Sequence, residues 1–137
     1  MDQGIIEVAI GLCAAIAMIM GVRALRADRV LILALITLPS IYAAFALIDG
    51  DVKKAGLELL VGLPFLMAGV ALFGRGTRLA LGIAGAFWIA HGLFDAVRED
   101  WLGNDGVPGW YPAVCLGVDL ATGAYLLLTS RRSTVNA

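Results

Sequence analysis

Five apolar stretches, each close to 20 residues long, occupy almost the whole of this 137-residue chain. A helix rises about 1.5 Å per residue, so about 20 apolar residues are needed to cross about 30 Å of membrane hydrocarbon. The sequence therefore predicts an all-α, polytopic membrane bundle of five transmembrane helices, forming a single domain. The predicted spans lie at residues 4–22, 30–48, 55–73, 79–97 and 111–129.

The composition excludes several other classes of protein. Hydrophobic residues make up 61% of the chain and charged residues only 15%, which is far too apolar for a water-soluble domain of this size. The apolar stretches lack the alternation with polar residues that membrane barrel strands require. A net charge of −1 with no basic patch beyond the span flanks gives no reason to expect nucleic acid as a partner.

The basic residues predict an orientation, because Lys and Arg concentrate in cytoplasmic loops. The side opposite the amino terminus carries Arg23, Arg26, Arg29, Arg75, Arg78, Arg131 and Arg132. The other side carries only Lys53, Lys54 and Arg98, with Arg98 at the start of a predicted loop. We therefore expect a multi-pass protein of the cell membrane, with its amino terminus outside and a cytoplasmic tail at residues 130–137.

Two pairs of segments match one another and predict an internal duplication. EVAIGL, which begins at Glu7, matches ELLVGL, which begins at Glu58. YAAFALID, which ends at Asp49, matches WIAHGLFD, which ends at Asp95. Matching carboxylates are informative because an acid is costly inside a membrane segment.

The matches define two helical-hairpin repeats, at residues 4–49 and 55–97. Both repeats have the same orientation, which is typical of parallel repeats related by an axis along the membrane normal. The helix at residues 111–129 is then an addition to the two repeats.

Ionisable side chains gather in the predicted outer half of the spans: Glu7, Asp49, Glu58, His91, Asp95 and Asp119. The inner half of the spans has no counterpart to this group. Ionisable residues within spans usually face the bundle interior or a water-filled cavity and mark functional sites. The economical interpretation is one polar pocket that opens outward.

His91 and Asp95 are four residues apart and therefore share one helix face, with Trp88 on the same stripe. A carboxylate in this position can accept the imidazole N–H and fix its tautomer. The pairing suits a general base, a proton carrier or a metal ligand. Asp119, about two turns into the last span, is too deep and too short to reach the interface easily.

These arguments divide the candidates into two groups. The catalytic candidates are His91, Asp95, Asp119, Glu58 and Glu7, and the substrate-binding candidates are Trp88, Tyr42 and Asp49. No metal ligand is assigned, and the sequence identifies no cofactor.

Each candidate also has a structural interpretation. Glu7 and Glu58 can belong to first helical turns, where the helix dipole favours a carboxylate. Asp49 can be a loop residue, and Trp88 and Tyr42 can pack in the core. The whole group can also be a hydrogen-bond network that holds the bundle together, because polar groups in lipid must pair internally.

The segments HGLFD and PGWYPAVCLGVD together resemble a family of small, uncharacterised integral membrane proteins found in bacteria and fungi. About a third of the chain carries this resemblance. It implies that His91, Asp95, Pro112, Cys115 and Asp119 belong to one signature that runs from the fourth helix into the fifth. It implies no established reaction.

Four functions are open on this evidence. The first is binding of, or acid–base catalysis on, a small lipidic or isoprenoid-like molecule at the outward-facing acidic and His pocket. The second is a proton- or cation-coupled transporter, and the third is a metal site, for which one histidine is few. The fourth is an accessory subunit of a membrane complex. Expected partners are membrane lipids and a lipidic small molecule, with further copies of the chain as an open alternative.

Overall fold

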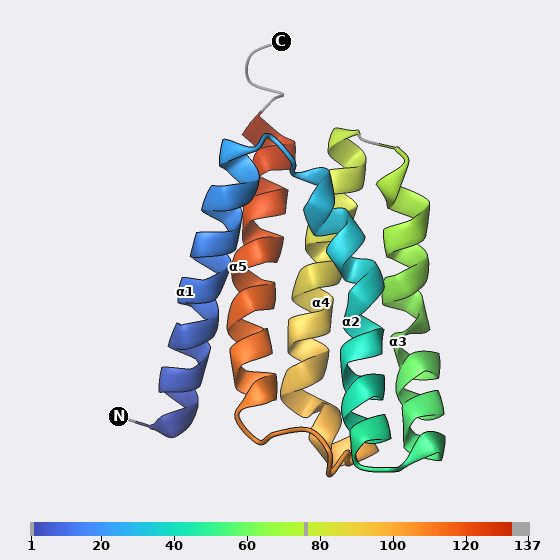
Figure 1. The fold of residues 1–137 in the computed structure, drawn as a ribbon. Coiled ribbons are helices and arrows are strands. Elements are labelled where there is room, and N and C mark those ends of the chain that lie inside the picture. Colours follow the sequence, from blue (N-terminus) through green and yellow to red (C-terminus); the bar gives the residue numbers. More distant parts are fainter. Residues whose placement is uncertain (1, 76, 133–137) are drawn as a thin grey trace.

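The computed structural model describes residues 2–75 and 77–132. Within these residues the chain forms five α-helices and no strand (Figure 1). The helices are α1 (Gln3–Ala24), α2 (Arg29–Ile48), α3 (Val52–Phe73), α4 (Arg78–Leu102) and α5 (Tyr111–Arg132). All five are long and apolar enough to cross a membrane. The predicted all-α bundle of five membrane-spanning helices is therefore confirmed.

The outward faces of the helices expose large apolar side chains. On α1, Ile5, Ile10, Ile16 and Met20 are each more than half exposed. Such a surface would be costly in water and is the normal surface of a helix that faces lipid tails. The bundle is therefore a multi-pass membrane protein.

The two ends of the bundle differ in charge. The amino terminus, the α2–α3 turn and the α4–α5 connection lie together at one end, here named the N-terminal end (Figure 1). The opposite end, here named the arginine-rich end, holds Arg23, Arg26, Arg29, Arg75, Arg78 and Arg131. The basic residues are thus separated in space as the sequence predicted.

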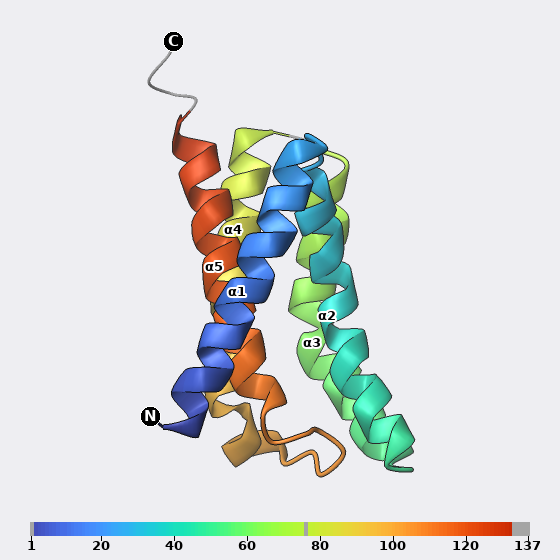
Figure 2. The same ribbon diagram turned by 60° about the vertical axis from the view of Figure 1, so that its left-hand side comes forward.

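Three helix pairs make most of the contacts: α4 with α5, α2 with α3, and α1 with α5 (Figures 1 and 2). In the α4–α5 interface a Cβ added to Gly85 would lie only 2.8 Å from the carbonyl oxygen of Gly123. Glycines allow this close approach, which matters because no hydrophobic effect drives helices together in lipid. The main pairs are not the two predicted hairpins, and the internal duplication stays a prediction.

The interior of the arginine-rich half of the bundle is an apolar layer that includes Leu31, Ile32 and Leu35 of α2 and Leu126 of α5, all with no exposed surface. Trp88 of α4 packs in the same layer, and its indole N–H donates to the carbonyl oxygen of Leu31 at 2.9 Å. This layer lies on the arginine-rich side of the polar residues that gather toward the N-terminal end.

The α4 helix is longer than the sequence predicted. It continues through Arg98 to Leu102, so the prediction that Arg98 begins a loop is wrong. The reason is that Arg98 is neutralised by Glu58 of α3, which lets a basic residue remain within the helix. After Leu102 the chain turns at Gly103, whose φ of +48° is easily adopted by glycine.

Candidate functional site

A buried cluster of His91, Asp95 and Asp119 lies toward the N-terminal end, between α4 and α5. The Nδ1 atom of His91 is 2.7 Å from an Oδ of Asp119 and 3.6 Å from an Oδ of Asp95. The three residues are 4%, 2% and 1% exposed, respectively. The structure therefore brings together the three strongest candidates that the sequence offered.

Helical spacing and one glycine explain this arrangement. His91 and Asp95 are one turn apart on α4, so both face α5. Gly92 lies between them in sequence, and a Cβ added there would be 2.8 Å from the Cβ of Asp119. The absence of a side chain at Gly92 thus allows Asp119 to come within hydrogen-bond distance of His91.

A second polar group, formed by Glu58, Arg98 and Asn104, lies beside the first. Arg98 Nη2 donates to Glu58 Oε1, and both side chains are almost fully buried. Asn104 Nδ2 donates to the same Glu58 oxygen at 2.9 Å and to the carbonyl oxygen of Tyr42 at 3.2 Å. Glu58 is therefore held by one charged donor and one neutral donor.

Tyr42 connects the two groups. Its ring centroid is 3.6 Å from the guanidinium carbon of Arg98, a cation–π contact, and 6.4 Å from the centroid of the His91 ring. The ring of Phe65 meets His91 edge-on, with centroids 4.9 Å apart. His91 is thus in contact with carboxylates on one side and aromatic rings on another.

Several buried polar atoms at the cluster have no hydrogen-bond partner among the described residues. They are both carboxylate oxygens of Asp95, the hydroxyls of Tyr42 and Thr122, and Nε of Arg98. Buried polar atoms are nearly always paired, because each unpaired one costs about 1–3 kcal/mol. The two oxygens of Asp95, which carry a charge when the group is ionised, therefore point to a proton, ion or water as an additional partner.

The charges of the cluster lead to the same conclusion. Glu58 and Arg98 neutralise one another, which leaves two carboxylates and a single imidazole. Even with His91 protonated, one negative charge remains. An uncompensated charge in a low-dielectric interior is costly, so one further positive charge is expected.

One histidine and two carboxylates also form a conceivable ligand set. One ligand atom each from His91, Asp95 and Asp119 lie within 4.8 Å of one another. Nitrogen and carboxylate ligands of this kind suit zinc or manganese, with water completing the shell. The prediction that no residue is a metal ligand therefore stays a prediction.

A small cavity lies beside Arg98, under the connection between α4 and α5. Its volume is about 20 Å³, and it is lined by Arg98, Asn104, Val107, Pro108, Gly109 and Pro112. About 10–15 Å³ is enough to hold one water molecule. The cavity therefore suits water or a small ion and is much too small for a lipid.

Toward the arginine-rich end the cluster is closed. Thr122 lies one turn from Asp119 on α5, on the side of the arginine-rich end. It is fully buried and is followed by the apolar layer around Leu126. The polar side chains therefore reach the N-terminal surface by a shorter path than the opposite surface.

Two predicted site residues lie elsewhere. Glu7 is half-buried on α1, where Gln3 Nε2 donates to it at 3.2 Å. Asp49 is exposed at the end of α2, beside Gly106. Neither residue is among the contacts described for the His91 cluster, so for Glu7 and Asp49 a shared pocket stays a prediction.

The remaining candidates are split between the site and the core. Tyr42 contacts the site, whereas Trp88 lies one turn deeper in the apolar layer, where its indole N–H is already paired. The sequence prediction missed Arg98 and Asn104. Arg98 could have been recognised because it lies seven residues after His91 and therefore on the same stripe of α4.

Comparison with known proteins does not identify a family for this chain. No protein-family model matches the sequence, and no curated protein or solved structure matches it either. The resemblance carried by HGLFD and PGWYPAVCLGVD stays a prediction.

Proposed function

We propose that this membrane protein binds a small cation, a proton or a metal ion, at His91, Asp95 and Asp119, and acts as a proton- or cation-coupled transporter. The observation that carries the proposal is Asp95, a carboxylate 2% exposed. It faces the Tyr42 hydroxyl and lies 3.6 Å from His91 Nδ1, yet neither of its oxygens has a partner at full hydrogen-bond distance among the described residues. A cation bound there would supply the positive charge that the two carboxylates need.

The dimensions of the site support an ion over a larger ligand. The cavity of about 20 Å³ beside Arg98 and Asn104 accommodates a water molecule or an ion on its way to the cluster. The apolar layer between Thr122 and the arginine-rich end closes the path from the cluster to that end. Transport would therefore require a second conformation, in which this layer opens while the N-terminal path closes.

The proposed orientation follows from the charges of the two ends. With the arginine-rich end in the cytoplasm, the positive-inside rule places the amino terminus and the cation entrance outside the cell membrane. The cluster would then take up its cation from the outer surface.

A second candidate is acid–base catalysis on a small lipidic molecule. It is favoured by the rings of Phe65 and Tyr42 around His91, which could stabilise a cationic intermediate. It would require the α4–α5 connection to move, because the cavity at the site is too small for such a substrate.

Flux measurements in proteoliposomes test the main proposal. Vesicles with the wild-type protein should acidify under an imposed proton gradient, or take up zinc or manganese, and Asp119→Asn should abolish either flux. Asp49→Asn removes an exposed carboxylate from the same end and should leave the flux unchanged. Sealed vesicles with no flux of any of these ions would contradict the proposal.

The same preparations distinguish the second candidate. Native mass spectrometry of the wild-type protein and of His91→Ala would show a bound lipidic molecule that only the wild type retains. That result together with absent flux would favour catalysis.

A further inference from the structure

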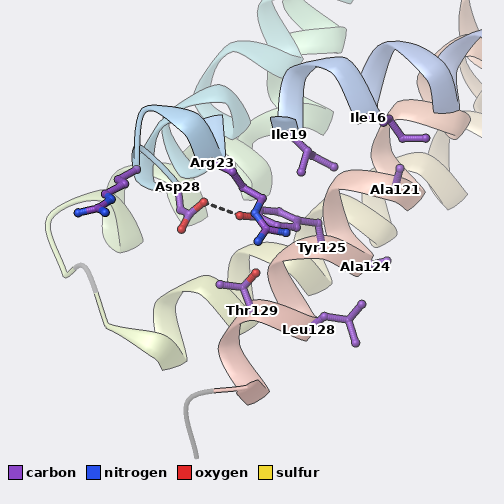
Figure 3. A pocket seen from close by; sticks show the side chains of 10 residues that line it. Ile16, Ile19, Arg23, Asp28, Ala121, Ala124, Tyr125, Leu128 and Thr129 are labelled. Atoms are coloured by element: carbon purple, nitrogen blue, oxygen red, sulfur yellow. Dashed lines mark hydrogen bonds between the residues drawn. The ribbon is translucent and has the colours of Figure 1, made fainter. Parts of the chain in front are cut away.

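An open groove lies near the arginine-rich end, between α1 and α5 (Figure 3). Its volume is about 610 Å³, within the range of about 300–1,000 Å³ that is common for ligand pockets. The groove lies on the outside of the apolar layer, and its lining does not include His91, Asp95 or Asp119. Nothing in the proposed cation site uses it.

The walls of the groove are apolar along its length and polar at one end. The apolar wall comprises Ile16, Ile19, Ala121, Ala124 and Leu128. The alanines leave room between the two helices. From Ile16 to Ala24, where α1 ends, the helix rises by eight residues, so the wall extends about 12 Å into the bundle from that end. This length accommodates the upper part of an acyl chain, which can continue into the surrounding lipid.

The polar end carries an excess of positive charge. Arg23 and Arg26 line it, and both side chains are exposed. Asp28 is the single acid there, and one of its oxygens accepts a hydrogen bond from the Tyr125 hydroxyl at 2.7 Å (Figure 3). Two guanidinium groups against one carboxylate leave a net positive charge where the groove meets the membrane surface.

We propose that this groove binds an anionic phospholipid, with its phosphate at Arg23 and Arg26 and one acyl chain against the wall of α1 and α5. Arginine matches phosphate oxygens in geometry as well as in charge. Basic pockets between membrane helices are typical binding sites for anionic headgroups.

The charge complementarity can be tested in nanodiscs or vesicles of equimolar phosphatidylglycerol and phosphatidylcholine. After mild detergent extraction, native mass spectrometry should show phosphatidylglycerol enriched on the protein. Arg23→Gln combined with Arg26→Gln should weaken its retention by about 30-fold, and Arg23→Gln alone by about fivefold. Arg29→Gln, which removes an exposed charge at the same end but outside the groove, should change it little.

A second pair of variants tests the groove itself. Ala124→Phe should fill the groove and release the lipid, whereas Ala71→Phe, on an exposed face of α3, should not. Soluble glycerol phosphate should fail to compete, because it lacks the acyl chain. Equal retention of phosphatidylcholine, equal loss in Arg29→Gln, or full competition by glycerol phosphate would overturn the proposal.

Discussion

The two ends of the bundle use the same kinds of residue in opposite ways. At the N-terminal end Arg98 is 2% exposed and bonded to a buried acid, whereas at the arginine-rich end Arg23 is exposed at the mouth of an open groove. A buried charge must be paired, so removing its partner is costly and its position is fixed. An exposed charge costs little to hold and is free to bind a ligand. Substitutions at the N-terminal end should therefore change mainly stability, and substitutions at the arginine-rich end mainly ligand binding.

The largest expected effect is the loss of Arg98. Arg98→Met leaves Glu58 buried without its charged partner and should lower the free energy of unfolding by about 3–5 kcal/mol. Thermal unfolding in a mild detergent measures this. Adding Glu58→Gln to the same variant should recover a large part of the loss. A single variant as stable as the wild type would contradict the description of this pair as buried and coupled.

A smaller effect is expected at Gly92. Gly92→Ala places a Cβ against Asp119 and should cost about 1–3 kcal/mol, because the α4–α5 interface must separate locally. Gly56→Ala on α3 is the matched control, since a Cβ there would meet nothing within 4 Å. Equal stability of the two variants, compared by chemical unfolding, would show that α4 and α5 do not meet as closely as described.

The substitution Thr122→Val should have almost no effect on stability. The Thr122 hydroxyl is buried and has no hydrogen-bond partner among the described residues, so Thr122→Val removes a polar atom without breaking a bond. Replacing an unpaired buried polar group by an apolar one of similar shape should change the stability by less than about 1 kcal/mol or increase it. A larger loss in thermal unfolding would mean that this hydroxyl holds an ordered water or ion, which would extend the cluster toward the arginine-rich end.

The smallest effect on stability is expected at Arg23. Because this side chain is exposed and forms no ion pair with another described residue, Arg23→Gln should change the free energy of unfolding by less than about 0.5 kcal/mol in lipid-free detergent. Adding phosphatidylglycerol should stabilise the wild type more than the variant. Equal stabilisation of both, in a thermal unfolding series with increasing lipid, would break the contrast between the two ends.

The sequence was sufficient to predict the membrane bundle, because the length and the apolar content of each span are properties of short segments. It also predicted that His91 and Asp95 act together, since residues four apart share one face of a helix. The meeting of this pair with Asp119 followed from the depth of each residue along its span, and the structure brings the three together.

Other features could not be predicted because they depend on which helices pack together. Glu7 and Glu58 have equivalent positions in the matching segments, yet only Glu58 faces Arg98, since α1 packs against α5 and α3 lies beside α2. Asn104 comes from the α4–α5 connection, which no periodic pattern places over Tyr42. The groove between Arg23 and Tyr125 likewise exists only because α1 and α5 are neighbours.

The most direct test asks what balances the two carboxylates in the cluster of His91, Asp95 and Asp119: a bound proton or a bound metal ion. Infrared difference spectroscopy detects a protonated carboxylic acid by its carbonyl stretch, and elemental analysis of the same purified protein detects a bound metal. We expect either a protonated carboxyl band that disappears in Asp95→Asn or Asp119→Asn, or one metal ion per chain that is lost in the same variants. Two fully ionised carboxylates without any bound metal would contradict the proposed cation site.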